Sequence, residues 1–153
     1  MSIVVRRVDI ADELVREQIH LLHQEVFTAE QWQHGKVPRF KTGYWWIAFV
    51  DGEPAGFGGM RPSARWDGTG YMCSAGVLKK FRRRGLQRRL IQKRVQMAAQ
   101  LGWHTVITDT VHDNASSMRS LIACGFRPYV PQVQWGDKDS AVYWIRSTTR
   151  KVA

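Results

Sequence analysis

The sequence has no long apolar segment, few cysteines and a deficit of negative charge. Its longest uninterrupted apolar run, Tyr44 to Val50, is far shorter than the roughly 20 residues that a membrane-spanning helix needs. The N-terminus lacks the basic, apolar and small-residue layout of a secretory signal, so a cytoplasmic location and no membrane partner are expected. Two cysteines, Cys73 and Cys124, allow at most one disulfide and are expected to be reduced core thiols.

Motifs of several functional classes are also missing. The chain contains neither the G-x-x-x-x-G-K-[ST] phosphate loop nor the G-x-G-x-x-G dinucleotide fingerprint. His20 and His23 have a spacing that is compatible with metal ligation, but no cysteine or carboxylate motif completes a site. We therefore expect these histidines to pack against the helix surroundings or to face solvent, and we expect no metal.

What the chain does contain is enough apolar material for one core. Hydrophobic residues make up 44% of its 153 residues and aromatic residues 11%, including seven tryptophans, which excludes a disordered chain. A chain of this length fits one domain, so residues 1–153 are expected to form a single unit.

Positive charge is concentrated in one segment of the chain. The formal net charge is +10, from 23 Lys and Arg against 13 Asp and Glu. Nine basic residues and no acidic one lie in a single stretch: Lys79, Lys80, Arg82, Arg83, Arg84, Arg88, Arg89, Lys93 and Arg94. This concentration favours phosphates, nucleic acid or an acidic surface as a partner, and a solvated helix face is the alternative.

Hydrophobic periodicity predicts strands alternating with helices. The expected strands cover residues 3–8, 44–50, 55–60, 71–78, 104–111, 127–130 and 141–146. A first helix runs through Val15 to Val26, with Asp9 as its cap and Asp12 in its first turn. Residues 31–42 are expected to form a short helical turn and a loop.

Two further helices are predicted in the second half of the chain. One ends at Gly102, and its expected inner face consists of Leu86, Leu90, Met97, Ala98 and Leu101. The other covers residues 114–124, and its expected inward residues are Met118, Leu121 and Ile122.

The connections between these elements predict the fold class. Asp51-Gly52 is a strong hairpin turn and demands antiparallel pairing, whereas the strand–helix–strand order of the second half implies parallel pairing. We expect a mixed α/β fold with six to seven strands and helices on both faces of the sheet. Trp45 and Trp46 alternate faces, so that one can lie in the core and the other can line a cleft.

A basic loop joins the strand that ends near Leu78 to the helix that begins near Leu86. The first amides of a helix have no partners within it, and the helix dipole adds partial positive charge, so this junction is suited to bind an anion. Arginine adds forked donors that match phosphate. The loop is therefore predicted to bind a phosphate group.

At this junction the sequence resembles the GCN5-related N-acetyltransferases, the GNAT family. The family signature Q/R-x-x-G-x-G/A corresponds to Arg82-Arg83-Arg84-Gly85-Leu86-Gln87, in which Gln87 replaces the final small residue. The family's N-x-x-S/A helix and its Gly-Phe correspond to Asn114 to Ser117 and to Gly125-Phe126, and the Asp51-Gly52 hairpin also fits. The resemblance extends over essentially the whole chain.

The resemblance implies acetyl-coenzyme A (acetyl-CoA) as co-substrate, bound where two parallel strands, residues 71–78 and 104–111, splay apart. It implies that the pantetheine arm pairs with the backbone of Gly76, Val77 and Leu78. It places the pyrophosphate on the amides of Arg83, Arg84, Gly85, Leu86 and Gln87, with Arg82 in the same turn and Asn114 and Ser117 on the other side.

The implied reaction is direct attack of a primary amine on the thioester. Leu121 occupies the position of the tyrosine that usually protonates the leaving thiolate in this family, and Tyr129 is the nearest replacement in the sequence. Asp109 is the candidate general base, with His112 and Glu25 as alternatives. Segments 25–44, 61–70 and 131–140 are expected to determine the acceptor, which the sequence does not identify.

Other functions remain open at this stage. Arg88, Arg89, Lys93 and Arg94 lie beyond the predicted pyrophosphate turn and suit nucleic acid or an acidic partner. A protein that binds acyl-CoA without turnover is a further alternative, suggested by Leu121. A homodimer is also compatible with the resemblance.

Overall fold

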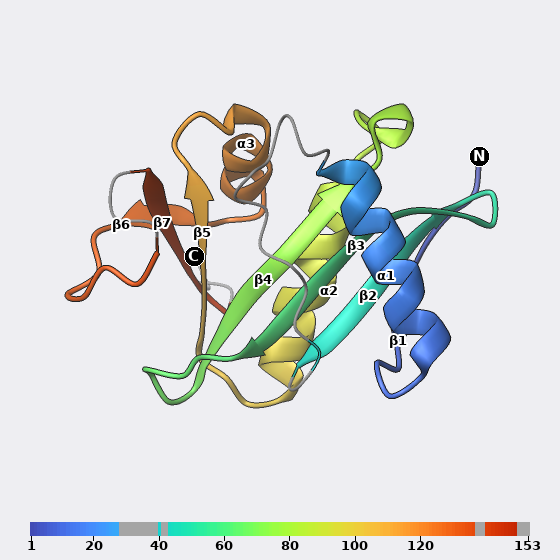
Figure 1. The fold of residues 1–153 in the computed structure, drawn as a ribbon. Coiled ribbons are helices and arrows are strands. Elements are labelled where there is room, and N and C mark those ends of the chain that lie inside the picture. Colours follow the sequence, from blue (N-terminus) through green and yellow to red (C-terminus); the bar gives the residue numbers. More distant parts are fainter. Residues whose placement is uncertain (28–39, 41–42, 137–139, 150–153) are drawn as a thin grey trace.

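Seven strands among the described residues form one sheet in the order β1-β2-β3-β4-β5-β7-β6 (Figure 1). The computed structural model describes residues 1–27, 40, 43–136 and 140–149. The strands are β1 (Ile3–Val8), β2 (Tyr44–Val50), β3 (Glu53–Pro62), β4 (Thr69–Val77), β5 (Thr105–Val111), β6 (Arg127–Tyr129) and β7 (Ala141–Ser147). Only β4 and β5 of these pair in parallel, and the mixed α/β sheet predicted from the sequence is confirmed.

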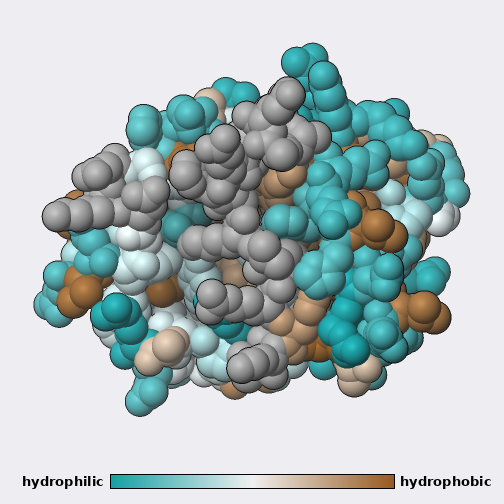
Figure 2. Space-filling model, in the orientation of Figure 1, coloured by the Kyte–Doolittle hydropathy of each residue, from teal (hydrophilic) through white to brown (hydrophobic). Residues whose placement is uncertain are grey.

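Three α-helices and one short 3-10 helix accompany this sheet in the described part of the chain: α1 (Glu13–Val26), η1 (Lys79–Phe81), α2 (Leu86–Gln100) and α3 (Ala115–Ala123). Figure 1 shows α1 in front of the sheet and α2 behind it, with α3 beside the end of β5. Helices on both faces are therefore confirmed. The side of α1 that faces away from the sheet is mostly hydrophilic (Figure 2).

The predicted hairpin joins β2 to β3. Asp51 and Gly52 both have left-handed φ angles, 48° and 80°, as a two-residue hairpin turn with the twist of its strands requires. Asp51 also accepts a hydrogen bond from the Ser2 amide at 2.7 Å, which holds the start of the chain against this turn.

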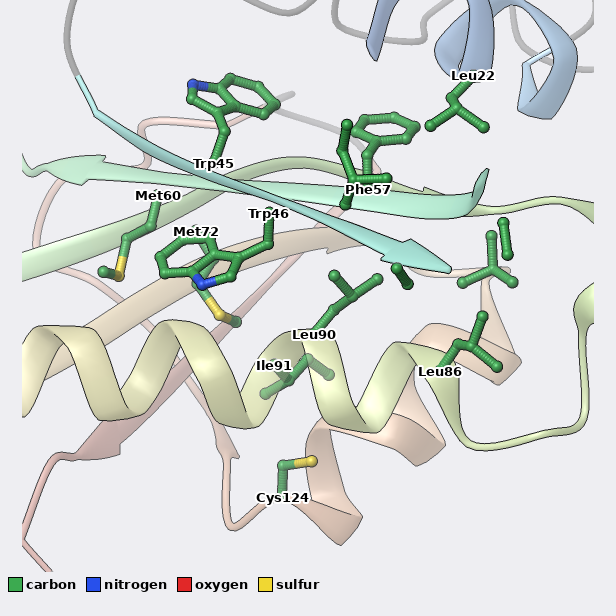
Figure 3. Packing of buried hydrophobic residues seen from close by; sticks show 14 of the residues in the cluster. Leu22, Trp45, Trp46, Phe57, Met60, Met72, Leu86, Leu90, Ile91 and Cys124 are labelled. Carbon is green, nitrogen blue, oxygen red and sulfur yellow. The ribbon is translucent and has the colours of Figure 1, made fainter. Parts of the chain in front are cut away.

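The core fills both faces of the sheet (Figure 3). Trp45 and Phe57 point toward α1 and Leu22, whereas Trp46 and Met72 point toward α2. The alternation of the two tryptophans is confirmed, but both are buried, at 1% and 3% exposure. The expectation that one of them lines a cleft is therefore wrong, because Trp45 packs against Phe40 and Trp46 packs toward α2.

The ends and faces of the helices differ in detail from the prediction. Asp12, not Asp9, caps α1 by accepting a hydrogen bond from the Leu14 amide, while Asp9 bonds Ala11 in the turn before it. On α3, Leu121 is buried but Ile122 is 59% exposed. The reason is that α3 buries only one narrow stripe, and Ile122 is rotated away from it.

The inner face of α2 also differs from the prediction. Leu86, Leu90 and Ala98 are buried as expected, but Leu101 is 38% exposed because it lies beyond the last turn of the helix. Ile91, Arg94 and Val95 complete the buried stripe instead. The expected loop structure at residues 31–42 lies outside the described residues, apart from Phe40, whose ring packs against His20 and Trp45.

Candidate active site

The parallel strands β4 and β5 separate after a short stretch of pairing. Their register consists of Thr69 with Thr105, Gly70 with Val106 and Tyr71 with Ile107. Both strands continue beyond these pairs, β4 to Val77 and β5 to Val111, and they diverge in Figure 1. The splay that the family resemblance implied is therefore present.

A cleft with a volume of about 1130 Å³ occupies this splay. Its walls are β4 from Tyr71 to Val77, β5 from Thr108 to Val111, the loop and first turns of α2, and one side of α3. At its closed end the Thr108 hydroxyl donates to the Met72 carbonyl at 2.9 Å. Beyond that bond, the edge of β4 that faces the cleft is not paired with β5.

A bulge distorts β4 within the cleft. Gly58 pairs with Ala75 and Met60 with Met72, so Gly59 alone lies opposite Cys73 and Ser74. An extra residue on one strand turns backbone groups out of the regular ladder. The bulge therefore presents the backbone of Cys73 and Ser74 to the middle of the cleft.

The basic loop ends in a helix N-terminus without a side-chain cap. Gly85 is the N-cap of α2, and the first helical hydrogen bond runs from the Arg89 amide to the Gly85 carbonyl at 3.1 Å. The amides of Leu86, Gln87 and Arg88 thus precede the helical ladder. Gly85 has a φ of 78°, and a Cβ placed there would meet no atom within 4 Å. The backbone angle, not crowding within the protein, requires glycine, and the space beside it is open to a ligand.

Packing fixes the shape of the loop before that glycine. The Phe81 ring is buried, with the Lys80 ammonium 5.0 Å and the Arg84 guanidinium 5.5 Å from its centre. Arg82 folds back so that its Nε donates to the Val77 carbonyl at 3.1 Å. Arg83 has a left-handed φ of 65°, an angle that few non-glycine residues adopt.

Most of the residues assigned to the coenzyme from the resemblance line this cleft. Those that do are Gly76, Val77, Arg82, Arg83, Gly85, Leu86, Gln87, Asn114 and Ser117. Leu78 and Arg84 are absent from the lining. The Leu78 amide donates to the Ala55 carbonyl and the Leu78 carbonyl accepts from the Phe81 amide, so both backbone groups already have partners within the protein. The coenzyme pairing expected at Leu78 stays a prediction.

The start of α3 forms the opposite wall of the cleft. Asn114 caps α3, with its side-chain oxygen accepting from the Ser117 amide at 3.2 Å. The Gln87 amide group in turn donates to the Ser117 hydroxyl at 3.4 Å, across from α2. These contacts join the two helix starts at the mouth of the cleft.

Tyr71 and Asp109 meet where β4 and β5 part. The Tyr71 hydroxyl donates to Asp109 Oδ1 at 2.9 Å, and both residues line the cleft. Burial raises the pKa of Tyr71 above its ordinary value of 10.0, and the negative charge and hydrogen bond of Asp109 add to this effect. The phenol therefore remains protonated and serves Asp109 as a donor at neutral pH.

The other catalytic candidates lie away from this pair. Tyr129 lines a separate small pocket with Tyr143 and Val130, because β6 pairs on the far side of β7. His112 and Glu25 are exposed and do not line the cleft. Leu121 does line it and is 4% exposed. The structure thus brings Asp109 to the cleft and leaves Tyr129 outside it.

The basic segment is divided between the cleft and the surface. Arg82, Arg83, Arg88 and Arg94 line the cleft. Arg94 is only 2% exposed, because its position falls on the inner stripe of α2. Arg88, Arg89, Lys93 and Arg94 were expected to suit a nucleic-acid or acidic partner, but Arg94 is buried and does not present its charge on the outer surface.

The two cysteines and the histidines of α1, which were considered as possible nucleophiles or metal ligands, pack within the protein. Cys73 and Cys124 are both free, and burial raises the pKa of each thiol. The His23 ring packs 4.8 Å from the Phe27 ring, and the His20 ring packs 5.1 Å from Phe40. Within the described ranges, no three His, Cys, Asp or Glu side chains group as metal ligands. No helix there is long and apolar enough to cross a membrane.

Comparison with known proteins agrees with this geometry. The family model described as "Acetyltransferase (GNAT) family" matches residues 8–126, which is most of the chain. The chain belongs to the GNAT family. No curated protein sequence matches it.

Solved structures with low sequence identity share this GNAT fold. The ribosomal-protein-S18-alanine N-acetyltransferase of Escherichia coli is 12% identical with a TM-score of 0.71, and the match covers 97% of this chain and 96% of that one. An acetyltransferase of Bacillus subtilis in complex with CoA is 12% identical with a TM-score of 0.70, over 95% and 99% of the two chains. yncA of Salmonella typhimurium, solved with acetyl-CoA, is 19% identical with a TM-score of 0.69, over 99% and 96%.

Two residues of this GNAT site escaped the sequence analysis. Tyr71 begins the predicted strand 71–78, but no spacing in the sequence links it to Asp109, which lies on another strand. Arg94 was interpreted as part of a charge run, although it is four residues after Leu90 and so shares the face of that apolar residue. That spacing is the signal that could have identified it.

Proposed function

We propose that this protein transfers an acetyl group from acetyl-CoA to a primary amine. The observation that carries the proposal is the cleft between β4 and β5, which ends at the uncapped N-terminus of α2. A linear arm with a diphosphate at one end and a thioester at the other fits such a cleft. The GNAT solved structures that contain CoA or acetyl-CoA support the choice of co-substrate.

The pyrophosphate is assigned to the loop. The amides of Leu86 and Gln87 and the left-handed Gly85 offer unpaired donors, and Arg82 and Arg83 supply charge beside them. The pantetheine arm is assigned to the edge of β4 at Gly76 and Val77, which has no β5 partner. An added arm with amide groups pairs with such an edge as an extra strand does.

Asp109 is assigned the role of general base. The acceptor amine is mostly protonated near neutral pH, so it must lose a proton before its nitrogen attacks the thioester carbonyl carbon. Asp109 accepts that proton, the new C–N bond forms, the C–S bond breaks, and the sulfur leaves as a thiolate. The second proton that the nitrogen loses in becoming an amide passes to solvent. Tyr71 positions the Asp109 carboxylate through its 2.9 Å hydrogen bond.

An amine-dependent release of coenzyme A thiol tests this function. With a panel of small amines and N-terminal peptides, the wild type should release thiol from acetyl-CoA. Asp109→Asn should lower kcat about a hundredfold and leave the KM for acetyl-CoA unchanged, because it removes proton transfer and not the coenzyme contacts.

Asp113→Asn is the matched control, because Asp113 lies four residues later, is exposed and does not line the cleft. It should retain wild-type kcat. Saturable acetyl-CoA binding without thiol release for any amine would favour a protein that binds acyl-CoA without turnover. Equal kcat values for Asp109→Asn and the wild type would exclude Asp109 as the base.

A further inference from the structure

A buried arginine without a countercharge lies at the closed part of the cleft. Arg94 is 2% exposed, on the face of α2 that also carries Leu90 and Ile91. Its Nε donates to the Leu90 carbonyl at 3.1 Å and its Nη1 to the Gly59 carbonyl at 3.3 Å. Both acceptors are neutral, and Nη2 has no hydrogen-bond partner within the described residues.

Gly58 of β3 leaves space for the Arg94 guanidinium. A Cβ on Gly58 would lie 3.2 Å from both Cζ and Nε of Arg94, which is tighter than ordinary contact, so the arginine side chain would have to shift slightly. The Gly59 carbonyl that accepts from Nη1 lies opposite the β4 bulge at Cys73 and Ser74. Arg94 therefore lies directly under the part of the cleft where β4 departs from regular pairing.

The charge of this side chain is not neutralised inside the protein. Burial lowers the pKa of Arg94 to about 10, and the Cys73 and Cys124 thiols oppose part of that effect. The guanidinium is thus still charged near neutral pH. No carboxylate forms an ion pair with Arg94 in the part of the chain that the structure describes. A buried cation of this kind is unfavourable unless an anion meets it.

We propose that Arg94 binds an anionic group at the acyl end of the bound coenzyme. The position fits, because Arg94 follows Gly85 by nine residues, about 13.5 Å of rise along α2, and so lies deeper in the cleft than the pyrophosphate loop. The guanidinium has donors to spare at Nη2, and such donors match a carboxylate or a thiolate.

Two sources of this anion are compatible with the geometry. One is the thiolate that leaves when the acyl group is transferred. Leu121, which lines the cleft, stands at the position where the resemblance places the tyrosine that usually protonates this thiolate. The other is the terminal carboxylate of a dicarboxylic acyl group such as succinyl. The inference rests on the coenzyme assignment of the proposed function and extends it to the acyl end.

Binding measurements with the whole chain distinguish the two sources. Calorimetry compares succinyl-CoA with butyryl-CoA, whose acyl chains have equal length and differ in the terminal carboxylate. A carboxylate source predicts that the wild type binds succinyl-CoA about ten to a hundred times more tightly, and that Arg94→Met abolishes this preference.

A thiolate source predicts a different result. The thiol of bound coenzyme A, followed by its ultraviolet thiolate absorbance, should titrate at least one pH unit below that of the free coenzyme, a tenfold stabilisation of the thiolate, and Arg94→Met should reverse the shift. The same titration with acetyl-CoA, which has no free thiol, subtracts the signals of Cys73 and Cys124. These thiols face Arg94 from β4 and α3.

Controls keep the inference separate from folding and from coenzyme binding. Lys93→Met removes the same charge from the exposed side of the same helix and should change neither result. Arg94→Lys keeps the charge and should retain part of the effect if Arg94→Met does not fold. A wild type that binds acetyl-CoA but shows neither the succinyl preference nor the thiol shift would overturn the inference. A wild type that binds no acetyl-CoA would instead overturn the proposed function.

Discussion

Tyr71 and Asp109 stand at the point where two paired strands become the two walls of a cleft. A buried phenol that donates to a carboxylate keeps that carboxylate in one orientation. In the proposed function, this places the general base at the closed end of the cleft. Asp109 was predicted from the sequence as a candidate general base, whereas no role was predicted for Tyr71.

The raised pKa of Tyr71 predicts how stability depends on alkaline pH. Because the folded-state pKa exceeds the unfolded value of 10.0, Tyr71 contributes stability that is complete below about pH 10 and is lost as pH rises further. Tyr71→Phe removes this loss. The unfolding free energy of the wild type should therefore fall more steeply above pH 10, by up to about 1.4 kcal/mol per pH unit relative to the variant.

Urea unfolding of both proteins between about pH 8 and pH 11 measures this difference, because all other titrating groups are shared. Tyr71→Phe should be the less stable protein at neutral pH, since it removes the hydrogen bond that the Tyr71 hydroxyl donates to Asp109. Parallel stability curves across this range would contradict the assignment of the alkaline loss to Tyr71.

At the scale of elements, α3 combines a structural role with a place in the cleft. Asn114 caps the helix through the Ser117 amide and also lines the cleft. The two roles separate by substitution. Asn114→Ala should lower the free energy of unfolding by about 1 kcal/mol, whereas Asn114→Asp keeps a capping oxygen and should retain most of the stability.

The two substitutions should rank in the opposite order when acetyl-CoA affinity is measured instead of stability. Asn114→Asp adds a negative charge beside the proposed phosphate site and should weaken binding more than Asn114→Ala does. Thermal unfolding and calorimetry of the two variants give both quantities. If Asn114→Asp binds acetyl-CoA as tightly as Asn114→Ala, the coenzyme does not pass this wall of the cleft.

Most elements could be predicted from the sequence, because their signals are local. Apolar alternation, the Asp51-Gly52 turn and the glycine at the end of α2 place the strands and helices to within about two residues over most of the chain. The errors at Asp9 and Leu101 concern the exact ends of helices, whereas the error at Ile122 arises because tertiary packing decides which side of a helix is covered. Periodicity identifies the apolar face of a helix, but it does not show which residues of that face another element covers.

The site was less predictable than the fold. The open, uncapped start of α2 could be inferred from Gly85 and the helix that follows it, because both are adjacent in the chain. The β4 bulge depends on the pairing of Gly59 with a distant strand, and the burial of Arg94 depends on the space above Gly58. Such features exist only once strands far apart in the sequence have been brought together.

At the scale of the whole molecule, the net charge of +10 has a more specific meaning than a basic surface. Four of the nine clustered basic residues line the cleft, one of them buried. Arg89 is exposed and donates to the Ile3 carbonyl at 3.0 Å, and Lys93 is exposed. The concentration of charge thus matches a coenzyme with several phosphates, while a nucleic-acid or acidic partner stays a prediction.

The central claim is that acetyl-CoA binds in the cleft with its pyrophosphate at Gly85, and calorimetric titration tests it most directly. Gly85 and Gly102 flank α2 and share a φ of 78°, and a Cβ placed on either would meet no atom within 4 Å, but only Gly85 lines the cleft. We predict single-site binding to the wild type and to Gly102→Glu with equal Kd, and at least about tenfold weaker binding to Gly85→Glu. Equal affinity of all three proteins, or no binding to the wild type, would contradict the account.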